Sequence, residues 1–155
     1  MNKARNIAFR KATIKDKEQV AYLMTLLHED LPLEEALDEY CYFLKKGVFF
    51  VACNAGKIAA YIHGVVRTDY VEGSEQYRDT KVGYIESLFV LPECRKQGIS
   101  RKLSQLFEEW AVSQGAKEMG SDAYADNKES IAFHKAMGFE VSKPIVGFIK
   151  KIKQD

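Results

Sequence analysis

The chain has 155 residues, of which 46% are hydrophobic and 29% charged, enough for the core of one domain of ordinary size. We therefore expect a single domain over residues 1–155. The formal net charge of +1 argues against a nucleic-acid-binding protein, because such domains usually carry a marked basic excess. No apolar stretch is long enough to span a bilayer, so no membrane association is expected.

Cysteine usage and the first residues predict a cytoplasmic location. The three cysteines are widely spaced and odd in number, which is typical of a reducing compartment and not of a disulfide scaffold. The first residues are polar and lack the apolar core of a signal peptide. The three histidines show no zinc-like spacing, so no metal is expected.

Acidic and basic residues are separated along the chain. Between Glu18 and Leu44 there are seven acidic residues and no Lys or Arg. Basic residues gather instead around residues 95–102 and near the C-terminus. The acidic segment is either a solvated helix surface or a surface that attracts a cationic substrate, and charge alone favours the first interpretation.

The first half of the chain predicts a strand, two helices and a hairpin. Thr13, with Asp16 three positions later, is typical of a helix start. Pro32 can open the second helix, and Gly47 can close it. The expected elements are a strand at 7–12, a helix that continues to residue 27, a helix at 32–47, and hairpin strands at 48–53 and 58–66.

The second half predicts strands that alternate with helices. Asn127 can cap the last helix, and Gly138 can follow its end. The expected elements are a loop at 68–80 that could cover a site, a central strand at 84–91, a helix at 99–113, a weak strand at 118–123, a helix from 127 to 137 and a final strand at 145–152. This order predicts an α/β (α+β) fold, with a mixed sheet and helices on both faces.

A glycine turn between the central strand and the next helix predicts a phosphate site. Helix N-termini offer free backbone N–H groups and a favourable dipole to anions. Gly98 alone could be an ordinary glycine at a helix start, but Arg95, Lys96 and Arg101 surround it with positive charge. The chain contains neither a Walker A loop nor a G-x-G-x-x-G motif, so ATP and dinucleotides have no support.

Two motifs together resemble the GNAT superfamily of N-acetyltransferases. The first is Arg95-x-x-Gly98-x-Ser100, which is similar to the acyl-CoA pyrophosphate turn written [Q/R]-x-x-G-x-[G/A], with Ser100 in place of the usual Gly or Ala. The second is N-x-x-S-x-x-F-H-x-x-x-G-F over residues 127–139, which resembles the superfamily's second motif. The resemblance implies a GNAT fold, with a mixed, mostly antiparallel sheet of six or seven strands, and acetyl-CoA as co-substrate.

The resemblance also implies which residues bind acetyl-CoA and which one protonates the leaving thiolate. His134 stands where many members have a Tyr as general acid, and His can donate a proton near neutral pH. Tyr124 or water remain alternative donors. The implied acetyl-CoA residues are Leu88, Phe89, Val90, Arg95, Lys96, Gln97, Gly98, Ile99, Ser100, Arg101, Asn127, Ser130 and Phe133.

A narrower resemblance concerns the acceptor. The segments around Tyr70, Glu86 and Asp122 look like one branch of the aminoglycoside 6′-N-acetyltransferases. In that branch Glu86 and Asp122 would face the antibiotic, and Tyr70 would lie on the acceptor-side loop. Glu86 is also the best candidate for the general base, because a carboxylate inside an apolar strand is costly to bury unless it is paired, and the resemblance places it where the superfamily carries out catalysis. Alternatively, Glu86 points outward and Asp122 merely begins a loop.

The leading hypothesis is acetyl transfer from acetyl-CoA to the 6′-amino group of an aminoglycoside. One alternative is an acetyltransferase for another amine, such as a polyamine or a protein amine. Another is a non-catalytic acyl-CoA-binding sensor. A homodimer is expected, because the final apolar strand needs a partner on its exposed edge and related enzymes often pair through C-terminal strands.

Overall fold

The computed structural model describes residues 6–74 and 81–154, so part of the predicted loop at 68–80 lies outside the described residues. The chain divides into two units, Met1–Asp122 and Ala123–Asp155, and each is described by itself. In the part of the chain that the structure describes, no helix combines the length and apolar character needed to cross a membrane. The single domain over residues 1–155 remains a prediction.

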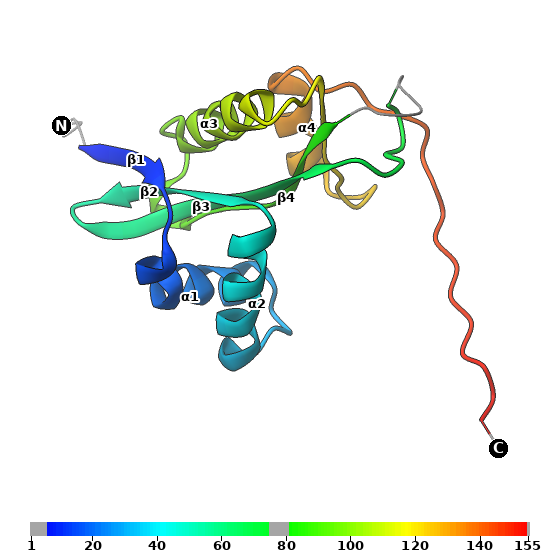
Figure 1. Cartoon of the computed structure of the whole chain (residues 1–155), viewed down its shortest axis with the longest axis horizontal. Coiled ribbons are helices and arrows are strands. Elements are labelled where there is room, and N and C mark those ends of the chain that lie inside the picture. Colours follow the sequence, from blue (N-terminus) through cyan, green and yellow to red (C-terminus); the bar gives the residue numbers. More distant parts are fainter. Residues whose placement is uncertain (1–5, 75–80, 155) are drawn as a thin grey trace. The chain divides into compact units, whose positions relative to one another are not determined.

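The first unit is a five-stranded sheet between helices. The strand order is β1-β2-β3-β4-β5, with every neighbouring pair antiparallel except β4 and β5, which are parallel. Helices α1 and α2 cover one face of the sheet and α3 covers the other (Figure 1). The elements are β1 (Ile7–Lys11), a 3-10 turn (Ile14–Asp16), α1 (Lys17–Leu27), α2 (Leu33–Lys46), β2 (Val48–Asn54), β3 (Lys57–Arg67), β4 (Val82–Val90), a 3-10 turn (Pro92–Cys94), α3 (Ile99–Ser113) and β5 (Glu118–Gly120). The mixed, mostly antiparallel sheet with helices on both faces is confirmed.

Two sheet glycines bring α3 close to the strands. A Cβ atom on Gly64 would come within 2.3 Å of the Phe107 ring, and one on Gly83 within 2.6 Å of the Ala111 side chain. Such distances are far below normal contact, so only glycine fits at these two positions. The helix that follows the predicted phosphate turn at Gly98 is therefore held firmly against β3 and β4.

The predicted helix start at Thr13 and Asp16 is confirmed. The backbone N–H of Lys15 donates to the Thr13 hydroxyl at 3.2 Å, and the Thr13 N–H donates to the Asp16 carboxylate at 2.8 Å. Arg10 adds two hydrogen bonds of 2.8 Å to the same buried carboxylate. These bonds from Arg10, opposed by burial, lower the pKa of Asp16. The N-terminal strand is thereby tied to the start of α1.

The second unit contains α4 (Lys128–Ala136), and both predicted ends of this helix are confirmed. The Asn127 side chain accepts a hydrogen bond from the Ser130 N–H at 3.1 Å, as an N-cap does. Gly138 follows the last cap residue, Met137, with φ at 93°. A left-handed residue at this position is the usual end of a helix, and glycine adopts it without strain.

The predicted final strand at 145–152 is wrong, and the described residues form five strands instead of six or seven. Residues 139–154 are neither helix nor strand. A strand requires a partner for its backbone groups, and residues 123–154, the described part of the second unit, contain no other strand. Six large apolar residues of this segment are 69–95% exposed: Val141, Ile145, Val146, Phe148, Ile149 and Ile152. The weak strand predicted at 118–123 also ends early, at Gly120.

Candidate functional site

Glu86 is the extra residue of a β-bulge in β4. His63 pairs with Ser87, whereas the next residue of β3, Gly64, pairs with Ile85, so Glu86 has no partner in the register. Bulges bend a strand and redirect the side chain of the extra residue, and they are frequent beside active sites. The strand therefore carries Glu86 out of the regular alternation, and the residue is exposed to solvent.

One edge of β4 is free beyond the bulge. Strands β4 and β5 pair only from Val82 to Tyr84, whereas β4 continues to Val90. The next contact is made by a side chain, because the Ser121 hydroxyl donates to the Ile85 carbonyl at 3.4 Å. Among the strands that the structure describes, none pairs with this edge after Tyr84. The stretch that contains Leu88, Phe89 and Val90 can accept an extended ligand as an additional strand.

The turn after this edge has the backbone of an anion site. Gly98 precedes α3 with φ at 78°, and Lys96 also has a positive φ, at 63°. The first bond of α3 joins the Lys102 N–H to the Gly98 carbonyl at 3.1 Å. The N–H groups of Ile99, Ser100 and Arg101 therefore have no acceptor within the helix, and they favour a phosphate together with the helix dipole.

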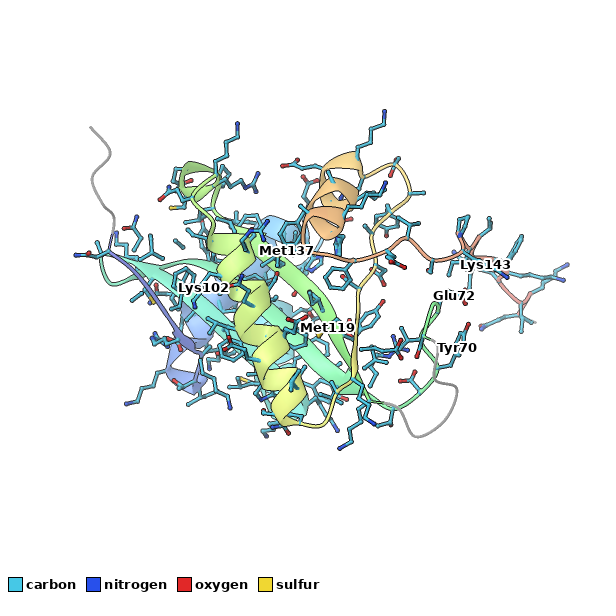
Figure 2. The ribbon with its side chains drawn as sticks, turned by 90° about the horizontal axis from the view of Figure 1, so that it is seen from above. Tyr70, Glu72, Lys102, Met119, Met137 and Lys143 are labelled. Carbon is cyan, nitrogen blue, oxygen red and sulfur yellow. The ribbon has the colours of Figure 1, made fainter. Side chains whose placement is uncertain are left out.

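The basic side chains of the turn fall into two groups. Arg95 donates to the Val90 carbonyl at 2.9 Å, and its guanidinium lies 5.6 Å from the Phe89 ring. It therefore joins the turn to the end of β4. Lys96 and Arg101 are exposed, and so is Lys102 on α3, which Figure 2 labels. These cations make the turn attractive to a diphosphate.

A second group of polar side chains surrounds Tyr84. Its hydroxyl donates to the Asp122 carboxylate at 2.7 Å, and the Arg67 guanidinium lies 4.7 Å from the centre of its ring. Arg67 also donates to Asp69 through two bonds of 3.0 and 2.6 Å. Residues from the end of β3, from β4 and from the segment after β5 therefore meet in one group.

Two charges of this group, those of Arg67 and Asp122, act on Glu86. The pKa of Glu86 is raised, first because its carboxyl group is partly desolvated and further because Asp122 is negative. The positive charge of Arg67 lowers the pKa of Glu86 and opposes these effects. A carboxyl with a raised pKa is a stronger base than an ordinary one, which suits proton removal from an ammonium group.

Tyr70 joins the same group through Arg67. The Arg67 guanidinium donates to the Tyr70 carbonyl at 3.2 Å, and the Tyr70 hydroxyl donates to Glu72 at 2.5 Å. Figure 2 shows Tyr70 and Glu72 on the same loop after β3. Two residues that sequence reasoning missed, Arg67 and Tyr84, thus connect Tyr70 with Asp122. Glu86 is coupled to this group through the charges of Arg67 and Asp122.

The second unit holds the second motif. The Nδ1 atom of His134 lies 2.7 Å from the Ser130 carbonyl and 3.4 Å from its hydroxyl. A carbonyl only accepts hydrogen bonds, so Nδ1 carries the proton in the shorter contact. The neutral ring then has no proton on Nε2, and His134 can give one from Nε2 only as an imidazolium. Phe133 and Phe139 flank this ring edge-on, at 5.6 and 5.3 Å.

A comparison with protein families agrees with the two sequence motifs and with the free edge of β4. The model of the acetyltransferase (GNAT) family matches residues 12–139, most of the chain. The chain belongs to the GNAT acetyltransferase family.

Relatives of this acetyltransferase share a name. Aminoglycoside N(6′)-acetyltransferase type 1 from Stenotrophomonas maltophilia is 32% identical over 142 residues, which are 90% of each protein. The protein of the same name from Acinetobacter baumannii is 39% identical over 93 residues, which are 60% of this chain and 62% of the relative.

Solved structures resemble this acetyltransferase along nearly the whole chain. Aminoglycoside N-acetyltransferase AAC(6′)-Iy in complex with CoA gives a TM-score of 0.89 at 25% identity, over 98% of this chain and 99% of the other. AAC(6′)-Ih from Acinetobacter baumannii gives 0.85 at 28% identity, over 96% and 100%. The comparison with AAC(6′)-Iy confirms the fold class and leaves the roles of individual residues as predictions.

The acetyltransferase shows no grouping of metal ligands in residues 6–74 and 81–154, where no three His, Cys, Asp or Glu side chains gather around one point. Its three cysteines are free thiols, and Cys94, beside the predicted phosphate turn, is buried. Direct acetyl transfer to an amine requires neither a metal nor a nucleophilic thiol.

Proposed function

We propose that this acetyltransferase transfers the acetyl group of acetyl-CoA to a primary amine of a small cationic acceptor, the 6′-amino group of an aminoglycoside. The observation that carries the proposal is the arrangement along β4. Glu86, with its neighbours Arg67 and Asp122, stands on the strand whose free edge leads directly into the phosphate turn. A base and a thioester can therefore meet on one strand. The names of the relatives supply the antibiotic and the position of the amine.

Acetyl-CoA would bind along β4 and the turn. The pantetheine arm would pair with the free edge at Leu88, Phe89 and Val90, and the diphosphate would lie at the start of α3. The N–H groups after Gly98 and the side chains of Lys96 and Arg101 supply donors there. Further contacts are expected from Gln97, Ile99 and Ser100, and from the second motif, through Asn127, Ser130 and Phe133. The solved complex of AAC(6′)-Iy with CoA supports the choice of ligand.

The reaction begins with an ammonium group, because amines are protonated near neutral pH. Glu86 would remove this proton directly or through a water molecule, and Asp122 and Tyr70 would hold the acceptor. The free amine then attacks the thioester carbon, and a backbone N–H of the Leu88–Val90 stretch stabilises the oxyanion. The tetrahedral intermediate loses a second proton from its nitrogen to solvent, and the C–S bond breaks as the carbonyl group re-forms. His134 would protonate the departing thiolate, and its contact with Ser130 requires the imidazolium form for this step.

The acidic segment supports a cationic acceptor. It forms α1 and α2, and six of its seven acidic residues are exposed. A surface of one sign raises the local concentration of the opposite charge, and this effect weakens as salt increases. A polyamine would benefit equally, so the choice of an aminoglycoside depends on the relatives and on the Tyr70 and Asp122 segments.

The proposal includes a cytoplasmic homodimer built of single-domain protomers. The exposed apolar residues of segment 141–152 support a partner chain, because monomers rarely expose so many large apolar side chains in succession. The free thiols agree with a reducing compartment.

Steady-state kinetics with three acceptors test the proposed function. The acceptors are kanamycin, an analogue with a hydroxyl group at the 6′ position, and spermidine. We expect kanamycin to give the highest kcat/KM and the analogue to react poorly. If spermidine is the better substrate, the acceptor is a polyamine, and equal acetylation of the analogue on nitrogen would refute the 6′ position. Acetyl-CoA binding without turnover on any amine would indicate a sensor.

A further inference from the structure

Tyr84 contacts both charged residues that influence Glu86. The tyrosine lies on β4 two positions before Glu86 and is 8% exposed, with its ring packed among Val65, Val71 and Val82. Gly120 leaves room for this ring, because a Cβ atom there would lie 3.0 Å from the Tyr84 Cδ2 atom. The ring is therefore fixed by the sheet, and only its hydroxyl and one face remain for polar contacts.

The two residues that Tyr84 contacts, Asp122 and Arg67, lie beyond the end of one strand and at the end of another, so regular structure restrains them less than it restrains Tyr84. Asp122 lies two residues beyond the end of β5, outside regular structure, and is exposed. The Tyr84 hydroxyl, at 2.7 Å, ties this carboxylate to the sheet. Arg67 is the last residue of β3, and its long side chain lies between the Tyr84 ring, at 4.7 Å, and Asp69. A long cationic side chain has many conformations, and an aromatic face restricts them.

We propose that Tyr84 is a positioning residue of the acceptor site, whose hydroxyl fixes the Asp122 carboxylate while its ring fixes the Arg67 guanidinium, so that both charges keep defined places beside Glu86. The consequence for acetyl transfer depends on the proposed function, whereas the arrangement of the four residues does not. Burial and the bond to Asp122 raise the pKa of the Tyr84 phenol, so it remains a hydrogen-bond donor at working pH.

The charged groups that face Glu86 come from two other segments, Arg67 at the end of β3 and Asp122 after β5. They act in opposite directions, because Asp122 raises the pKa of Glu86 and Arg67 lowers it. Removing the Tyr84 hydroxyl should release Asp122 towards solvent and lower the pKa of Glu86. Removing the Arg67 charge should raise the pKa of Glu86. General damage to the fold would not lower this pKa in one variant and raise it in the other.

The test is a carbon-13 NMR titration of glutamate carboxyl groups in the free protein, with the Glu86 signal assigned from Glu86→Gln. We expect the Glu86 midpoint to fall in Tyr84→Phe and in Asp122→Asn, and to rise in Arg67→Met. Tyr22→Phe, which removes an exposed hydroxyl on α1, should leave it unchanged. A Glu86 midpoint in Tyr84→Phe equal to that of the wild type would overturn the proposal.

Kinetics then connect the geometry to the reaction. Tyr84→Phe should raise KM for kanamycin about three- to tenfold, as expected for one lost hydrogen bond, with little change in acetyl-CoA affinity. In the pH profile of kcat/KM for Tyr84→Phe, the fall on the acidic side should shift in the same direction as the NMR midpoint of Glu86. If the wild type acetylates no amine, the proposed function fails and the NMR titration still decides the role of Tyr84. An unchanged KM and an unshifted fall on the acidic side would contradict a positioning role.

Discussion

The imidazole of His63 stacks on the ring of Phe49, with the ring centres 4.3 Å apart and the planes at 10°. The Phe43 ring lies 5.0 Å away, and the histidine is 4% exposed. Its Nε2 atom has no hydrogen-bond partner among the residues that the structure describes. This apolar burial lowers the pKa of His63 to about 4 from the ordinary 6.5. The folded protein therefore keeps this ring neutral where an exposed histidine would be charged.

The stability of the protein should depend on pH through His63. Between pH 6.5 and 4 the unfolded chain binds a proton on this residue that the folded chain does not bind. Stability should therefore fall as the pH drops through this window, by about 2 kcal/mol between pH 7 and pH 5. Urea unfolding at both pH values measures the effect.

Two variants separate His63 from other titrating groups. His63→Phe keeps an aromatic ring against Phe49. Between pH 7 and pH 5 its stability should fall by about 2 kcal/mol less than that of the wild type. His28→Gln, which changes an exposed histidine, should behave like the wild type. Equal acid sensitivity of His63→Phe and the wild type would show that the folded protein accommodates the charged ring.

Gly98→Val should weaken acetyl-CoA binding at least tenfold. Gly98 has φ at 78°, a conformation that a β-branched residue rarely adopts, and the neighbouring N–H groups must approach a diphosphate closely. A Cβ atom there meets nothing within 4 Å, so loss of binding would come from backbone change and blocked approach, without a clash in the protein. Calorimetry with acetyl-CoA measures the affinity.

Gly56→Val is a matched control for this change. Gly56 lies in the β2–β3 hairpin with φ at 82°, and its Cβ position is equally open. Both variants should lose similar stability, of the order of 1–2 kcal/mol, whereas only Gly98→Val should lose affinity. Unchanged acetyl-CoA affinity in folded Gly98→Val would exclude the turn as the diphosphate site.

Local sequence signals predicted the parts of the fold that depend on neighbours in the chain. Thr13 with Asp16 and Asn127 with Gly138 mark helix ends because their bonds close over a few residues. The prediction of a final strand was wrong because a strand forms only beside a partner strand, and the sequence does not indicate which segment that partner would be. Tyr84 was interpreted as one more apolar residue of a central strand, since its partner Asp122 lies 38 positions later. Arg67 was missed for the same reason, because the Tyr84 ring that its guanidinium contacts lies 17 positions later in the chain.

Glu86→Gln should lower kcat about 10²- to 10⁴-fold while acetyl-CoA affinity stays near that of the wild type. The amide keeps the shape of the side chain and cannot accept the proton of the ammonium group. Stopped assays of thiol release with kanamycin measure kcat, and Glu108→Gln on the exposed face of α3 is the control. A Glu86→Gln variant within a few-fold of the wild type would mean that bulk water removes the proton.

His134→Phe should reduce kcat, because a phenyl ring cannot give a proton to the departing thiolate. The Ser130 carbonyl lies 2.7 Å from Nδ1 of His134, so the proton would be given from Nε2. His134→Tyr, which introduces the residue common in the superfamily, should restore part of the rate, and thiol release with kanamycin measures it. Equal kcat for His134→Phe and the wild type would assign the proton to Tyr124 or to water.

The protein should form a homodimer at micromolar concentration, because segment 141–152 exposes apolar and β-branched residues that form no strand within their own unit. Such a segment can gain backbone hydrogen bonds by pairing with another chain. Light scattering gives the mass, and a monomer would contradict the prediction.

Phe148→Pro and Ile149→Pro each remove one N–H group, on opposite edges of an extended segment, so at least one should shift the mass towards monomer. Phe148→Ala and Ile149→Ala keep the backbone donors and should shift it less. If alanine and proline weaken the dimer equally at both positions, side-chain burial and not strand pairing holds the two chains together.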